Sequence, residues 1–197
     1  FLPSSLVDIR LKDPLQIYLN RIGGELKIVT ANKCEYNDLL WADILIVHRE
    51  TSLETVGIMS IAQRLGIPVV YDTDDWLAGL PSWSSTYHQT LKQIAIMEQV
   101  IATAARVTCT TQCLKEQLLK HTDKIEIVPN IIPKTEKLYD AKSKQFDENC
   151  SLIVSSSDTI VLDFLMPVIE KICQLFPKIK VIAIGKIADK FNNITSN

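Results

Sequence analysis

The sequence predicts an α/β fold in which helices flank a parallel β-sheet. Two observations indicate this fold. The first is a series of short apolar runs bounded by polar residues, and the second is that longer segments between them have apolar residues at steps of three and four. Strands that alternate with helices of this length are typical of βαβ units, whose strands run parallel. No longer sequence repeat recurs along the chain, which argues against a solenoid.

The expected strands are short aliphatic runs. Residues 44–47 are all aliphatic and have polar neighbours on both sides, as in a strand that is buried on both faces. Pro68 stands at the start of another run, where a strand tolerates a residue without a backbone N–H. The predicted strands are 26–30, 43–48, 67–72, 106–110, 124–128, 151–154 and 178–184.

Four segments carry helical periodicity. Gly66 is a stop signal after the first of them, and the Thr111 hydroxyl can cap the third. Pro167 lies inside the fourth and predicts a kink or a later start, because proline removes a helical hydrogen bond. The predicted helices are 52–65, 87–105, 112–121 and 159–176.

The organisation of the chain points to two domains. Its 197 residues are enough for one domain of about 150 residues and part of another. Residues 134–149 are rich in Lys, Asp, Ser and Glu and poor in aliphatic residues, so we interpret them as a linker. This linker separates a first domain, 1–133, from the start of a second, 150–197. The chain opens on Phe-Leu-Pro-Ser, which resembles the end of a strand, so we expect a fragment of a longer protein.

Composition narrows the class of protein. Hydrophobic residues make up 47% and charged residues 22%, as in soluble globular domains. A net charge of −2 disfavours nucleic-acid partners and general binding to anionic membranes. Five scattered cysteines fit reduced cytoplasmic thiols better than a disulfide framework. No aliphatic run approaches the roughly 20 residues of a membrane span, and the start does not read as a signal peptide. We therefore expect a cytoplasmic protein.

An acidic turn, residues 72–76, follows the predicted strand 67–72 and reads Asp72-Thr-Asp74-Asp75-Trp76. Like charges this close repel one another, which calls for a compensating partner. A divalent cation such as Mg²⁺ or Mn²⁺ would provide one. Sugar hydroxyls that donate to the carboxylates, with Trp76 as a stacking surface, would provide another. A capped and solvated turn explains the same residues without any ligand. All three interpretations stay open at this point.

Other strand ends carry weaker signals. Arg49 can clamp a phosphate or carboxylate with two hydrogen bonds, or it can pair with Glu50 or Asp72 and neutralise the acidic turn. His48 fits a hydrogen-bonded residue at a strand end better than a catalytic base. Residues 155–157 are serines that lead into a helix, whose N-terminal amides can hold a phosphate. The glycine patterns of dinucleotide-binding folds, P-loops and esterases are missing from the sequence.

Four segments together resemble the GT-B glycosyltransferases, especially the nucleotide-sugar-dependent family 4 type. Ile-Pro-Val-Val-Tyr-Asp-Thr-Asp-Asp-Trp, residues 67–76, resembles the family's strand and acidic turn. Residues 105–111 and 125–130 resemble its Ala-Asp-x-Val segment and the Val-Pro-Asn that ends the first domain. Residues 153–185 resemble the strand, helix and strand that open the second domain and finish in Gly185.

The resemblance implies two Rossmann-like domains that face each other across a cleft. The first would bind a glycan or lipid-linked acceptor, and the second a nucleotide-sugar donor. Hexosyl transfer in polysaccharide biosynthesis would be the activity, with no cofactor or divalent metal required. Peripheral contact with the inner membrane face is a further family expectation. The implied acceptor residues are Arg49, Asp72, Asp74, Asp75 and Trp76; Asn130 would lie at the cleft, and Ser155, Ser156, Ser157 and Gly185 at the donor.

The chain also departs from the family. Residues 150–197 are much shorter than the about 150 residues of a complete domain. The paired glutamates and the basic pair that mark the donor site do not occur in them, and serines stand where a glycine-rich turn is expected. We therefore expect the chain alone to be inactive, with its catalytic residues unassigned. A non-catalytic nucleotide- or sugar-binding module is the main alternative. A phosphate-accepting receiver domain and a metal-dependent GT-A transferase fit the strand ends less well.

Overall fold

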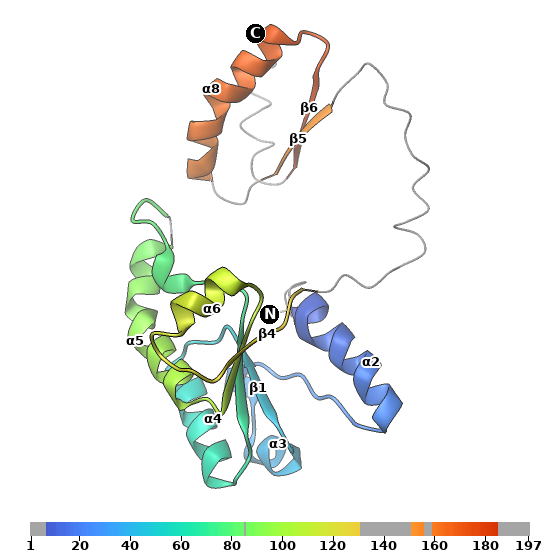
Figure 1. Ribbon diagram of the computed structural model, residues 1–197, viewed down its shortest axis with the longest axis vertical. Coiled ribbons are helices and arrows are strands. Elements are labelled where there is room, and N and C mark those ends of the chain that lie inside the picture. The colour runs from blue at the N-terminus through green and yellow to red at the C-terminus, as the bar shows by residue number, and fades with distance from the viewer. Residues whose placement is uncertain (1–6, 85, 131–150, 156–158, 185–197) are drawn as a thin grey trace. The chain divides into compact units, whose positions relative to one another are not determined.

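The computed structural model describes residues 7–84, 86–130, 151–155 and 159–184 (Figure 1). The chain divides into two compact units. The first unit consists of Phe1–Leu80 and His88–Pro133, and the second of Pro81–Tyr87 and Lys134–Asn197.

The first unit is built on a sheet of four parallel strands in the order β1-β2-β3-β4 (Figure 1). Its register aligns Val47 with Tyr71, Tyr71 with Val107, and Val107 with Ile125. The α/β fold with a parallel sheet and flanking helices is therefore confirmed for this unit. The strands are β1 (Leu45–His48), β2 (Val69–Thr73), β3 (Arg106–Cys109) and β4 (Ile125–Ile127).

Three helices follow the first three strands, as the βαβ pattern predicts. Ser52 and Thr111 cap the first and third, because their hydroxyls accept hydrogen bonds from the N–H groups of Thr55 and Leu114 at 3.2 Å. The prediction of a Thr111 cap is thus confirmed. The helices are α4 (Leu53–Arg64), α5 (Tyr87–Thr103) and α6 (Gln112–Leu118).

The core of the first unit lies between the sheet and these helices. Strand β2 is buried along most of its length, and Val107 and Cys109 of β3 are buried. Residues 44–47 were predicted to form a strand buried on both faces, and this is wrong: in that run only Val47 is buried, and Ile44 is exposed. The reason is that β1 is the edge strand of the sheet, with a neighbouring strand on one side only. Burial of each large apolar side chain contributes about 1.5–3 kcal/mol to folding. The largest fully buried apolar side chains are Tyr71, Ile101, Leu118, Val69, Val100 and Val107.

The N-terminal region differs from the expectation. Residues 26–30 were predicted as a strand, and this is wrong: they form no strand, and Ile28 and Val29 are exposed. A β-prone run needs a neighbouring strand to pair with its backbone, and this segment has none. Two helices also precede β1 that the sequence analysis did not predict. They are α2 (Asp13–Ile22), which continues a π-helical turn η1 (Asp8–Lys12), and α3 (Tyr36–Trp41), after the short 3-10 turn η2 (Ala31–Lys33).

The described part of the second unit is one β-α-β motif. Strands β5 (Ser151–Ser155) and β6 (Lys180–Ile184) are parallel, and α8 (Thr159–Leu175) connects them with Pro167 in its interior. Val154 and Ile169 are its buried residues, whereas Ile153, Ile182 and Phe164 are exposed. These exposed side chains leave apolar surface on the motif uncovered. The division at 134–149 itself stays a prediction.

No helix in the described ranges is long and apolar enough to cross a membrane.

Candidate functional site

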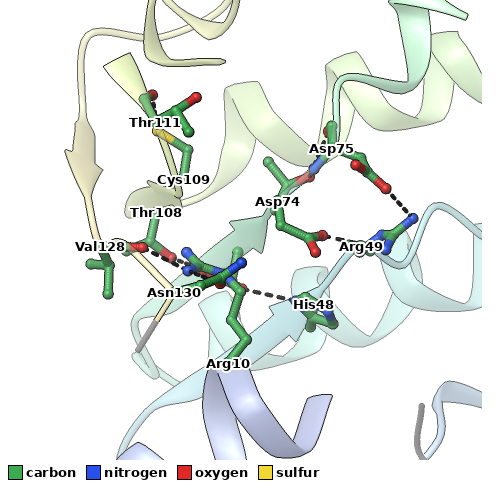
Figure 2. A network of polar contacts seen from close by, with 12 residues as sticks. Arg10, His48, Arg49, Asp74, Asp75, Thr108, Cys109, Thr111, Val128 and Asn130 are labelled. Carbon is green, nitrogen blue, oxygen red and sulfur yellow. Dashed lines mark hydrogen bonds and ion pairs between the residues drawn. The ribbon is translucent and has the colours of Figure 1, made fainter. Parts of the chain in front are cut away.

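The candidate site lies at the carboxyl ends of β1, β2 and β3. Parallel strands end at the same edge of a sheet, and the register places His48 beside Asp72 and Asp72 beside Thr108. Ligands of open parallel sheets bind at this edge. Figure 2 shows that Arg10, from the helical turn before α2, reaches the same place.

Asp72 is the buried centre of this site, with 1% of its surface exposed. Arg10 donates to it through two parallel bonds: Nε to Oδ2 at 2.8 Å and Nη2 to Oδ1 at 2.6 Å. His48 Nδ1 lies 2.8 Å from Oδ2, and the Thr108 hydroxyl donates to Oδ1. Four donors therefore satisfy the two carboxylate oxygens, a geometry that allows a charge to be buried.

The environment keeps Asp72 ionised. Burial alone would raise the pKa of this carboxyl, but hydrogen bonds from His48, Arg10 and Thr108 and the charge of Arg10 oppose it. Their sum holds the pKa of Asp72 below its ordinary value. A carboxylate can only accept hydrogen bonds. In the hydrogen bond between the two residues, Nδ1 of His48 is therefore the donor and carries the proton.

Arg10 also connects the N-terminal helical segment, η1 with α2, to the end of the sheet through hydrogen bonds. Its Nη1 donates to the carbonyl of Val128 at 2.6 Å and to Oδ1 of Asn130 at 3.2 Å (Figure 2). These contacts join residues 118 and 120 positions apart in the chain. Asn130, which the resemblance places at a domain crossing, is thus held against the carboxyl edge.

His48 has one nitrogen without a partner. Its side chain is 9% exposed, and Nε2 is buried with no hydrogen-bond partner among the described residues. In the neutral tautomer with the proton on Nδ1, Nε2 is a lone-pair acceptor. A buried acceptor left unpaired costs about 1–3 kcal/mol. A ligand that donates a hydrogen bond would remove this cost.

Arg49 joins the acidic turn to β1. Its guanidinium contacts Asp75 at 2.6 Å and Asp74 at 3.3 Å (Figure 2). Its backbone has φ of 54°, in the left-handed region that disfavours side chains with a Cβ. Arg49 thus compensates one of the two negative charges of Asp74 and Asp75 and leaves a local charge of −1. Among the described residues, no three His, Cys, Asp or Glu side chains gather as a metal site.

Two substitutions of Arg49 can separate the effect of its backbone strain on stability from the effect of its charge. Arg49→Ala and Arg49→Gly both remove the ion pairs, which contribute about 0–1 kcal/mol because they are partly exposed. Glycine alone relieves the left-handed strain. We expect the glycine variant to be more stable than the alanine variant by about 1 kcal/mol in urea denaturation. An alanine variant of equal or greater stability would contradict the strain at Arg49.

The structure separates the predicted acceptor residues into two groups. Asp72 faces inward to Arg10, whereas Asp74 and Asp75 pair with Arg49. Trp76 is half-buried, and its ring lies 5.8 Å from the ring of His121 between centroids. Of the predicted donor residues, Ser155 ends β5, while Ser156, Ser157 and Gly185 lie outside the described residues.

A groove adjoins this site along the edge strand β1. Its volume is about 340 Å³, and it lies between the helical N-terminus, residues 25–30 and β1. Leu11, Leu15, Ile44 and Ile46 give it apolar walls, and His48 is among its lining residues. Sequence reasoning missed both this groove and Arg10. The Pro14 start, the apolar steps from Leu11 to Ile22 and the Gly-Gly stop would have revealed the helix, but not its contact with Asp72.

The chain matches no protein-family model and no curated protein.

Proposed function

We propose that the chain belongs to a nucleotide-sugar-dependent glycosyltransferase that transfers a hexosyl group to a glycan or lipid-linked acceptor. The observation that carries the proposal is the gathering of His48, Arg49, Asp74 and Asp75 at the carboxyl edge of a parallel sheet. Carboxylates and an imidazole accept hydrogen bonds from sugar hydroxyls, and an α/β sheet places its ligand at this edge.

The proposal assigns a part to each unit. The first unit, with Asn130 at the inter-domain cleft, binds the acceptor, and the second begins the nucleotide-sugar domain with Ser155, Ser156, Ser157 and Gly185 near the donor. Catalysis is electrostatic, through stabilisation of the positive sugar and the leaving diphosphate. No resident cofactor is required, and the protein acts in the cytoplasm or at the inner membrane face.

The main alternative is a non-catalytic sugar- or nucleotide-binding module. The Arg49 ion pairs favour it, because a turn whose carboxylates are already paired within the chain can bind neutral sugars without chemistry. Binding of nucleotides to the first unit in the absence of sugar would favour this module over the transferase.

The acidic turn provides the test by mutation. The double variant Asp74→Asn and Asp75→Asn should weaken binding of methyl glycosides at least fivefold, because amides are weaker acceptors for hydroxyls than carboxylates. Its melting temperature should stay near that of the parent. The matched control is Asp123→Asn with Glu126→Gln, which are exposed elsewhere. Unchanged binding by the turn variant would contradict the acceptor assignment, and unfolding would make the turn structural.

Divalent cations give an independent prediction. Mg²⁺ or Mn²⁺ at millimolar concentration should move the melting temperature by less than about 1 °C, since Arg49 already pairs with both carboxylates of the turn. Differential scanning fluorimetry measures this shift directly. A rise of several degrees that a chelator reverses would instead establish a metal site at the turn.

A further inference from the structure

We propose that the groove along β1 binds the apolar part of an amphiphilic alcohol, whose hydroxyl group donates a hydrogen bond to Nε2 of His48. This inference rests on the proposed acceptor role of the first unit and specifies the acceptor. The ligand is a hydroxyl-bearing molecule with an apolar body, such as a sugar on a hydrocarbon chain. A free polar glycan lacks that body.

The groove has the size and lining of a small-molecule site. Its 340 Å³ falls in the lower part of the range of such sites, about 300–1,000 Å³. Its walls are mainly aliphatic, and Lys27 pairs with Asp38 among the lining residues. An apolar body in contact with these walls would lose its hydration, which is the main driving force for binding.

Polar groups of β1 give the groove its specificity. The N–H groups of Leu45 and Arg49 donate toward β2, to the carbonyls of Pro68 and Asp72. Because N–H groups alternate along a strand, those of Ile46 and His48 point to the opposite edge, on the side of the groove. A ligand hydroxyl can therefore accept from an N–H and donate to Nε2, which is buried and has no hydrogen-bond partner in the part of the chain that the structure describes.

A small molecule fits these observations better than a protein strand. Residues 25–30 of the chain itself form part of the groove lining opposite β1. A strand added to the edge of β1 would lie about 4.8 Å from it and would have to displace that segment. A small amphiphile leaves residues 25–30 in place, because its apolar body occupies groove space that is already open.

The test compares two probes that share one sugar head. The ¹⁵N-labelled chain is titrated with n-octyl β-D-glucoside, below its micelle-forming concentration, and with methyl β-D-glucoside. Amide and imidazole ¹⁵N shifts report binding. We expect the octyl probe to bind at least tenfold more tightly, to shift residues 25–30 and 44–48, and to shift Nε2 of His48.

Two variants test whether octyl glucoside binds in the groove and contacts His48. His48→Gln should weaken octyl glucoside binding at least fivefold, with the exposed His88→Gln as matched control. Leu15→Glu places a charge in the groove wall and should weaken binding similarly, which keeps the test valid if the His48 variant fails to fold. Equal binding of both probes, or unchanged binding by Leu15→Glu, would overturn the proposal.

Other outcomes distinguish this inference from the proposed function. If methyl glucoside shifts residues 72–76 while the octyl probe leaves the groove unchanged, the groove proposal fails and the acceptor role stands. If the octyl probe shifts the groove and octyl sulfate does so equally without any shift of Nε2, the hydroxyl contact is overturned. Groove shifts that grow with protein concentration alone would identify a second copy as the occupant and overturn the proposal.

Discussion

Replacement of Arg10 by methionine is expected to lower the free energy of unfolding by about 3–5 kcal/mol, the cost of breaking a buried ion pair. Methionine keeps much of the apolar volume of the arginine stem. It removes both hydrogen bonds to Asp72 and those to Val128 and Asn130. The buried carboxylate would then keep only His48 and Thr108 as donors. Urea denaturation followed by circular dichroism measures the loss.

The control for this variant is Lys12→Met, two residues away. Lys12 forms an exposed pair with Asp8 at 3.3 Å, which should contribute no more than about 0–1 kcal/mol. A second comparison adds Asp72→Leu to Arg10→Met. Removal of both charges should recover much of the stability, since no unpaired buried charge remains. A loss below about 1 kcal/mol for Arg10→Met would contradict the buried pair.

Acid should destabilise the first unit through the same carboxylate. The pKa of Asp72 is depressed in the folded chain, so the unfolded chain takes up its proton first as the pH falls. The contribution of Asp72 is fully present above its unfolded pKa, near 4, and is lost as the pH falls through its lower folded pKa.

Asp72→Asn should remove this part of the pH dependence. The variant is less stable at pH 7, because Arg10 then faces a neutral amide, and its free energy of unfolding should fall less steeply below pH 4. Asp43→Asn, on the exposed surface, should retain the parental slope. Parallel stability curves for Asp72→Asn and the parent between pH 2 and 6 would contradict the assignment of acid sensitivity to Asp72.

The sheet could be predicted from sequence because its signals are local. Residues 43–48 and 67–72 are apolar runs between polar ends, and β1 and β2 lie within one or two residues of them. The predicted cap at Thr111 is local in the same way, since its hydroxyl accepts from the N–H group three residues later. Residues 26–30 show where prediction from local sequence fails. They have the composition of a strand, but only a paired neighbour would make them one.

The site was predictable only where its parts are close in sequence. Arg49 and the acidic turn follow neighbouring strands, and their ion pairs agree with the interpretation that Arg49 neutralises the turn. The inward orientation of Asp72 was not predictable, because its partner Arg10 lies 62 residues earlier. The prediction of a hydrogen-bonded His48 is confirmed by its contact with Asp72, but the strand-end position gave no sign that its other nitrogen would have no partner among the described residues.

The most direct test of the central claim, that the carboxyl edge of the first unit binds a sugar acceptor, is an amide NMR titration of the chain. Methyl glycosides of several hexoses are added in turn, followed by UDP and GDP. We predict saturable shifts from at least one glycoside at residues 48–50 and 72–76, and none there from the nucleotides. Shifts at these residues from a nucleotide, with none from any glycoside, would contradict the claim.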